Sequence, residues 1–65
     1  MTLDEVKRRV EVIRIIANDD ERAHSEEDDL RDDVLRAIAA GAPNACELAA
    51  EVLKTSEIEF SRWCA

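Results

Sequence analysis

Glycine and proline are nearly absent from this chain, which holds one of each among 65 residues. Both stand in one short segment, as Gly41 and Pro43. A protein of many short strands needs a turn every roughly 8–12 residues, and it uses glycine and proline for many of them. A few long helices with short connections need far fewer such residues. We therefore expect an all-α fold, a compact three-helix bundle.

The size and composition of the chain fit one small domain covering residues 1–65. Hydrophobic residues make up 46% of it and charged residues 38%, which is too apolar for a disordered segment. This length is close to the lower limit at which a hydrophobic core stabilises a fold unaided. No apolar run approaches the roughly 18 residues of a membrane span, and the N-terminus lacks the order of a signal peptide. We expect a cytoplasmic protein without membrane contact.

The first predicted helix begins at about Leu3, because Thr2 and Glu5 have the spacing of a capping box. Its end is predicted at residues 18–20. Val12 and Ile15 lie off the main apolar stripe, so this helix has more apolar surface than one face needs, and we expect it to support a homodimer. The stripe itself repeats at spacings of three and four: Leu3, Val6, Val10, Ile13 and Ala17.

The second predicted helix covers residues 26–40. Ser25 and Asp28 again have capping-box spacing, and Gly41 is the residue type that most often ends a helix in the left-handed conformation. Its buried stripe is predicted to be Leu30, Val34, Ala37 and Ile38, with Leu35 at the margin.

The third predicted helix follows Pro43, with Asn44 as its cap and Glu47 reaching back to the cap. Many alanines in this segment favour close approach to the other two helices. One broad apolar side is predicted, made of Ala45, Cys46, Leu48, Ala49, Val52 and Leu53.

Residues 55–65 are predicted to close the open end of the bundle with Phe60 and Trp63, the two aromatic residues of the chain. Ser56 is a suitable cap for a short fourth helix that would place both aromatic rings on one side. The alternation of Ile58 and Phe60 suits an extended tail equally well. We favour one helical turn.

Few residues of the chain are suited to catalysis or metal binding. His24 is the one histidine, and we interpret it as a residue that covers the start of the second helix. Cys46 and Cys64 lack zinc-ligand spacing, and we favour two packed free thiols over a disulfide. The acidic residues lack the order of a calcium-binding loop. We expect no enzyme activity, no cofactor and no metal.

The net charge of −7 arises within residues 19–33, where nine acidic residues meet Arg22 and Arg31. Outside this segment seven acids balance seven bases. Such a patch repels nucleic acid and attracts basic surfaces, although charge runs are also often plain solvated faces. We predict a protein-interaction domain that docks on a basic surface of a partner protein. The candidate docking residues are Asp19, Asp20, Glu21, Glu26, Glu27, Asp29, Asp32 and Asp33.

An alternative comes from residues 34–63, which resemble a degenerate helix-turn-helix, the fold of many transcription regulators. The likeness lies in residues 47–49, 52–56 and 60–63, and it implies a scaffold helix followed by a short turn and a recognition helix. Glu57 and Glu59 stand beside a single Arg62 in that recognition helix, so its surface repels phosphates. We expect no direct contact with nucleic acid. A related alternative is a phage inhibitor whose acidic patch mimics DNA.

The runs at residues 19–28, 34–39 and 53–64 resemble a group of short proteins from actinobacteria and their phages. The likeness covers about residues 18–65, and this group has no assigned activity. The resemblance implies an intracellular setting and nothing about mechanism. Arg62 and Trp63 in the last run are interpreted as a C-terminal anchor.

Overall fold

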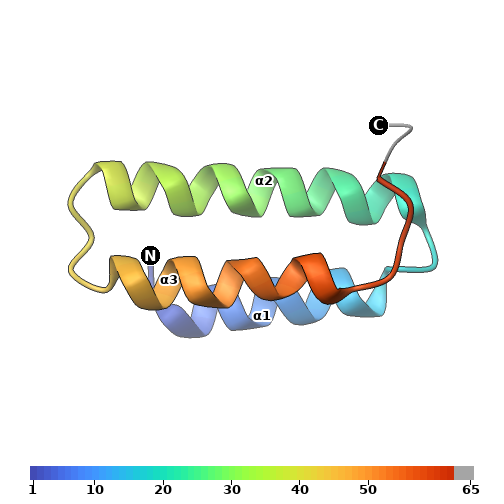
Figure 1. Ribbon diagram of the computed structural model, residues 1–65, viewed down its shortest axis with the longest axis horizontal. Helices are drawn as coiled ribbons and strands as arrows, with labels where there is room; N and C mark the ends of the chain where they lie inside the picture. The colour runs from blue at the N-terminus through green and yellow to red at the C-terminus, as the bar shows by residue number, and fades with distance from the viewer. Residues whose placement is uncertain (63–65) are drawn as a thin grey trace.

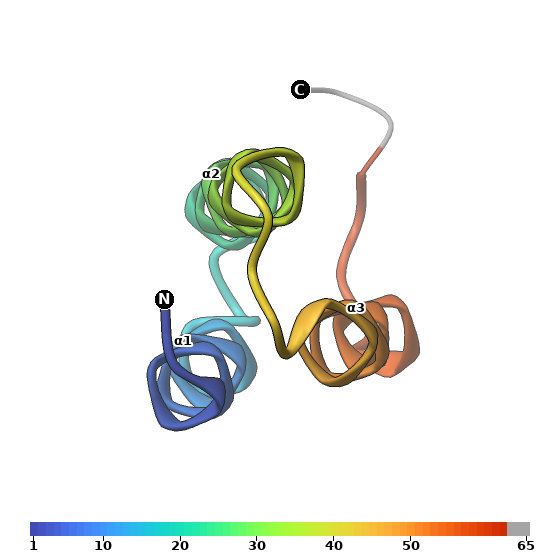
Figure 2. The same ribbon diagram turned by 90° about the vertical axis from the view of Figure 1, so that its left-hand side faces the viewer.

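Three α-helices and one 3₁₀ helix form the part of the chain, residues 1–62, that the computed structural model describes. They are α1 (Leu3–Ile15), α2 (Asp20–Ala39), α3 (Ala45–Val52) and the 3₁₀ helix η1 (Leu53–Glu57). The helices lie lengthwise beside one another (Figure 1), and the end view shows them at the corners of a triangle (Figure 2). No strand occurs within residues 1–62. The all-α three-helix bundle is confirmed.

Helix α1 begins where its sequence predicts. The backbone N–H of Glu5 donates to Oγ1 of Thr2 at 3.1 Å, and the N–H of Thr2 donates to Oε1 of Glu5 at 3.3 Å. This capping box satisfies amide donors that the first helical turn leaves free. Val6, Val10 and Ile13 are buried as the stripe predicts. The helix ends at Ile15, earlier than the predicted stop at residues 18–20.

Helix α2 begins at Asp20, so the prediction of a start at residue 26 is wrong. Asp19 is the N-cap, and its Oδ1 accepts a hydrogen bond from the N–H of Arg22 at 3.2 Å. Ser25 therefore lies inside the helix and exposed, and its capping box with Asp28 does not form. The earlier start makes a helix of 20 residues that buries Ala23 completely.

The connection from α2 to α3 follows the sequence in part. Gly41 has φ +92, the left-handed conformation predicted for it. Asn44 is the N-cap of α3 as predicted, but its side chain makes no capping hydrogen bond. Cys46 is exposed, so the prediction that this thiol packs in the core is wrong, and Cys64 lies outside the described residues.

The core runs through the middle of the triangle. Ile58 belongs to it although this residue lies beyond the last helix, and Phe60 packs against the core while partly buried. All three α-helices contribute the rest: Val6, Val10 and Ile13 from α1, Ala23, Leu30 and Val34 from α2, and Leu48 and Val52 from α3.

Residues 58–62 of the tail form no helix, so the favoured helical turn is wrong over this described part. Ser56 lies within η1, where its hydroxyl donates to the carbonyl of Leu53 at 2.7 Å instead of capping a new helix. Ile58 has extended φ and ψ, and residues 58–62 run from the end of η1 to the N-terminal end of α2 (Figures 1 and 2). Ile58 and Phe60 close the bundle here, and Trp63 lies outside the described residues.

Candidate functional site

The acidic segment that the sequence singled out is partly used inside the molecule. Asp19 caps α2, and Oδ1 of Asp20 accepts a hydrogen bond from the N–H of Ser61 at 3.0 Å. Asp33 pairs with Arg9 of α1 at 2.7 Å and so joins two helices. Glu27 is only 3% exposed, so its assignment to the docking surface is wrong.

Glu27 is the centre of a polar contact between α2 and the tail. Arg62 donates to both of its oxygens, from Nε to Oε1 at 2.9 Å and from Nη2 to Oε2 at 3.1 Å. This two-point geometry is the strongest form of an arginine–carboxylate pair. Arg31 lies farther off, with Nη2 at 3.9 Å from Oε2. A carboxylate within the protein is thereby neutralised by a residue 35 positions away.

The guanidinium of Arg62 also holds the backbone of the tail. Nη2 donates to the carbonyls of Thr55 at 2.8 Å and Ile58 at 3.0 Å, and Nη1 donates to the carbonyl of Phe60 at 3.3 Å. The same group lies over the Phe60 ring, 3.8 Å from its centroid. Arg62 is therefore the C-terminal anchor that the sequence indicated, and Glu27 is its partner.

The charge state of Glu27 results from opposing effects. Burial raises the pKa of this carboxyl, whereas the hydrogen bonds of Arg62 and the Thr55 hydroxyl and the positive charges of Arg62 and Arg31 lower it. The lowering effects win, so the pKa of Glu27 lies below its ordinary value of 4.5. Glu27 in turn raises the pKa of Arg62. The pair is ionised at neutral pH.

Four exposed carboxylates remain on the outward face of α2, and we call them the acidic strip. A turn of about 100° per residue puts them opposite the buried side of the helix, where Ala23, Leu30 and Val34 lie. The members of the strip are Glu21, Asp28, Asp29 and Asp32.

Two members of the acidic strip have a side-chain partner, and only one of these partners, Arg36, is a permanent cation. Asp28 lies 3.5 Å from Nε2 of His24, and Asp32 lies 3.6 Å from Nη2 of Arg36. Within residues 1–62, Glu21 and Asp29 make no ion pair. Glu26, half-buried, is a predicted docking residue that lies beside the strip. The strip thus contains three of the predicted docking residues, Glu21, Asp29 and Asp32, together with Asp28, which was not among them.

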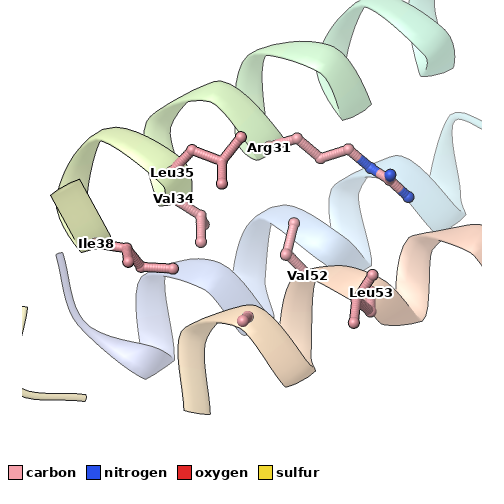
Figure 3. A pocket seen from close by; sticks show the side chains of 7 residues that line it. Arg31, Val34, Leu35, Ile38, Val52 and Leu53 are labelled. Carbon is pink, nitrogen blue, oxygen red and sulfur yellow. The ribbon is translucent and has the colours of Figure 1, made fainter. Parts of the chain in front are cut away.

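An apolar groove lies between α2 and α3 and was not predicted. Arg31 is the one charged residue that lines it, and the space measures about 210 Å³. Figure 3 shows the apolar side chains of α2 facing those of α3 and η1 across it. We call this feature the apolar groove; its other lining residues are Val34, Leu35, Ile38, Ala49, Val52 and Leu53.

One partial sign of this groove is present in the sequence, because Leu35 falls at the margin of the stripe of α2. Leu35 is 63% exposed and Leu53 is 59% exposed, so both are rim residues. Placing Leu53 in the packed side of the third helix was wrong. Its exposure depends on how α3 is rotated against α2, which the periodicity of a single helix does not specify.

Val12 and Ile15 occupy the outer face of α1, as their position off the stripe indicates. Their exposed fractions are 39% and 70%. The homodimer expected from them stays a prediction.

His24 lies inside α2, not in front of its first turn, so its predicted role at the helix start is wrong. It does not line the groove. Among residues 1–62, no group of three or more His, Cys, Asp and Glu side chains is arranged to hold a metal ion.

The helix-turn-helix resemblance requires a recognition helix after the turn. The described part of that segment consists of η1 and then the extended residues 58–62. No α-helix follows α3 in the chain up to Arg62, so the described residues contain no recognition helix to place in a DNA groove.

Comparison of the chain with family models, curated proteins and solved structures found no match in any of the three. A search of the described residues for helices of sufficient length and hydropathy to cross a bilayer also found none. The geometry of the chain itself therefore carries the functional proposal.

Proposed function

We propose that this chain is a non-enzymatic protein-interaction domain that docks on a basic surface of a partner protein through the acidic strip of α2. One observation carries the proposal. After the carboxylates used inside the molecule are set aside, Glu21, Asp28, Asp29 and Asp32 still share one outward helix face. Two of them, Glu21 and Asp29, have no neutralising partner within residues 1–62.

The arrangement supports electrostatic recognition for a physical reason. Charges fixed on one face of a helix sum to a directional field, which speeds encounter with a surface of opposite sign and disfavours partners of like sign. With a net charge of −7 on 65 residues, the field of this chain excludes nucleic acid and selects basic proteins. Such a basic partner surface includes the DNA-binding face of a protein.

The experiment is affinity capture from a lysate of the cells that produce this chain, with two variants of equal charge. The test variant carries Glu21→Gln, Asp29→Asn and Asp32→Asn. The control carries Asp4→Asn, Glu47→Gln and Glu57→Gln, three exposed acids away from the strip. We expect the wild type and the control to capture the same partner and the test variant to lose it.

Salt and DNA refine this result. Capture should weaken as ionic strength rises, because the Debye length falls to about 3 Å at 1 M salt. Duplex DNA added in excess should displace the chain if the basic surface is a DNA-binding face. A partner that the test variant and the control capture equally well would overturn the proposal.

A further inference from the structure

The apolar groove lies on the same helix as the acidic strip, and this placement points to the kind of segment that binds there. Resting on the proposed function, we propose that the groove receives an amphipathic helix of the partner, with apolar residues in the groove and basic residues against the strip. Recognition of this type, a helix in a groove, uses apolar anchors at helical spacing.

The dimensions of the groove suit side chains of a helix. From Arg31 to Ile38, the α2 wall covers about two helical turns, roughly 10 Å. Apolar anchors at positions i, i+3 or i+4, and i+7 of a docked helix have the same reach, because seven residues rise roughly 10 Å. The volume of about 210 Å³ is below the roughly 300–1,000 Å³ of typical small-molecule pockets, so it suits a few apolar side chains better than a whole ligand.

The rims of the groove favour burial. Leu35 and Leu53 stand on opposite walls and expose more than half of their surface. Covering both removes apolar area from water at one place. Because these side chains are already exposed, the domain does not need to open in order to bind.

The charges around the groove select the flank of the partner helix. Asp28 and Asp32 precede Leu35 by seven and three residues on α2, which places them beside this rim at the border of the acidic strip. On the opposite wall, Lys54 follows Leu53 and is paired with Glu51 at 3.0 Å. Asp32 is paired with Arg36 at 3.6 Å, so Asp28, whose one neighbour of this kind is His24 at 3.5 Å, is the rim carboxylate without a permanent cation beside it. A basic residue on the α2 flank of a docked helix complements Asp28.

The same charges disfavour a second copy of this chain as the occupant. A symmetric dimer uses the same patch on both subunits, so pairing through the groove would bring two acidic strips close together. Each chain carries a net charge of −7, and no basic face of α2 is present to offset the repulsion. Charge complementarity thus favours a basic partner helix.

The test uses a synthetic peptide of about 18 residues, roughly five helical turns, built from leucine and lysine with the leucines on one face. A peptide of equal composition with its leucines scattered around the helix is the peptide control. Fluorescence anisotropy gives the affinity of the intact chain for each, and NMR chemical shifts locate the contact.

The variants separate the groove from the charge. Leu35→Asn with Leu53→Asn removes both rims without changing net charge, and Ile15→Asn is the matched control, an exposed apolar residue on α1. We expect the rim variant to lose about tenfold or more in affinity and the control to stay within about twofold. The shifts of the wild type should centre on residues 31–38 and 49–53.

Each contrary result has a distinct meaning. If the test charge variant weakens peptide binding while the rim variant does not, the groove is not the site and the inference fails, whereas the proposed function stands. If neither variant changes the affinity, both fail. Equal binding of the two peptides overturns the helix proposal. Sedimentation that shows a dimer dissolved by the rim substitutions would assign the groove to a second copy instead.

Discussion

The two halves of α2 differ sharply on the side that faces the end of the chain. In the first half, Asp20 and Glu27 meet the tail through directional hydrogen bonds from Ser61 and Arg62. In the second half, Leu35 and Ile38 face α3 across an open apolar groove. One helix thus presents a covered polar half and an uncovered apolar half. The first half determines where the tail lies, and the second is free to receive another molecule.

The contacts of the covered half explain why residues 58–62 form no helix. A buried carboxylate destabilises the fold unless it is paired and hydrogen-bonded. The guanidinium of Arg62 pairs with Glu27 and still has donors left, and these bind the carbonyls of Thr55, Ile58 and Phe60. The extended backbone that begins at Ile58 leaves the carbonyls of Ile58 and Phe60 without intrahelical partners, so they can join the carbonyl of Thr55, in η1, on one cation. A helical turn would instead use such carbonyls in its own hydrogen bonds.

Substitution of the anchor, Arg62, should have the largest effect on the covered half of α2. Arg62→Ala leaves Glu27 buried without its partner, and we expect a loss of about 3 kcal/mol, the lower end for a broken buried pair because Arg62 is partly exposed. A domain of this size has roughly 3–5 kcal/mol in total, so the variant should retain no more than about 2 kcal/mol. Urea denaturation followed by circular dichroism measures the change. Arg36→Ala, at an exposed pair with Asp32, is the control and should change stability by less than about 0.5 kcal/mol.

Acid should weaken the same half of α2 by a smaller amount. The folded-state pKa of Glu27 lies below its ordinary value of 4.5, so its contribution is complete above that pH and is lost as the pH falls through the folded value. Glu27→Gln removes the contribution at every pH. We therefore expect the difference in unfolding free energy between wild type and Glu27→Gln to be largest near neutral pH and to shrink below pH 4.5.

The exposed Glu57→Gln is the matched control for this titration. Its difference from the wild type should stay small across the range, since surface charges contribute little to stability. A difference for Glu27→Gln that is constant with pH would show that the pair with Arg62 does not control the ionisation of this carboxyl.

The start of α2 sets how far the covered half extends, and a cap substitution tests it. Asp19→Ala removes the side chain that accepts from the N–H of Arg22, and we expect a loss of about 1 kcal/mol. Ser25→Ala should be neutral or slightly stabilising, because Ser25 lies inside the helix and alanine has the higher helix propensity. Thermal unfolding compares the two. The reverse order of effects would restore the start at residue 26.

This pair of caps also shows what the sequence determines locally. The start of α1 and the left-handed Gly41 were predicted because neighbouring residues alone fix them. Asp19 and Ser25 are both good caps, and local rules do not choose between them. The choice depends on distant contacts: an early start buries Ala23 and brings Asp20 to the N–H of Ser61.

Some features of the candidate site can likewise be predicted from local sequence, and others depend on distant contacts. The exposed carboxylates of the acidic strip and the exposure of Val12 and Ile15 follow from charge and periodicity along single helices. The pairing of Glu27 with Arg62 joins residues 35 positions apart, so no local pattern reveals it. The apolar groove likewise depends on the packing of α3 against α2. Sequence reasoning thus identified the outward surface but not the contacts between elements.

The smallest expected effect concerns the uncovered half. Leu35→Asn and Leu53→Asn change side chains that are mostly exposed, so each should alter the free energy of unfolding by no more than about 0.5 kcal/mol, as surface substitutions usually do. Ile15→Asn on α1 sets the reference, being exposed to a similar degree. A loss well above that reference would mean that the groove walls support the core, and the contrast between the two halves of α2 would disappear. A near-neutral result would mean that Leu35 and Leu53 do not support the core. Large exposed apolar side chains that the fold does not need for stability are available for binding.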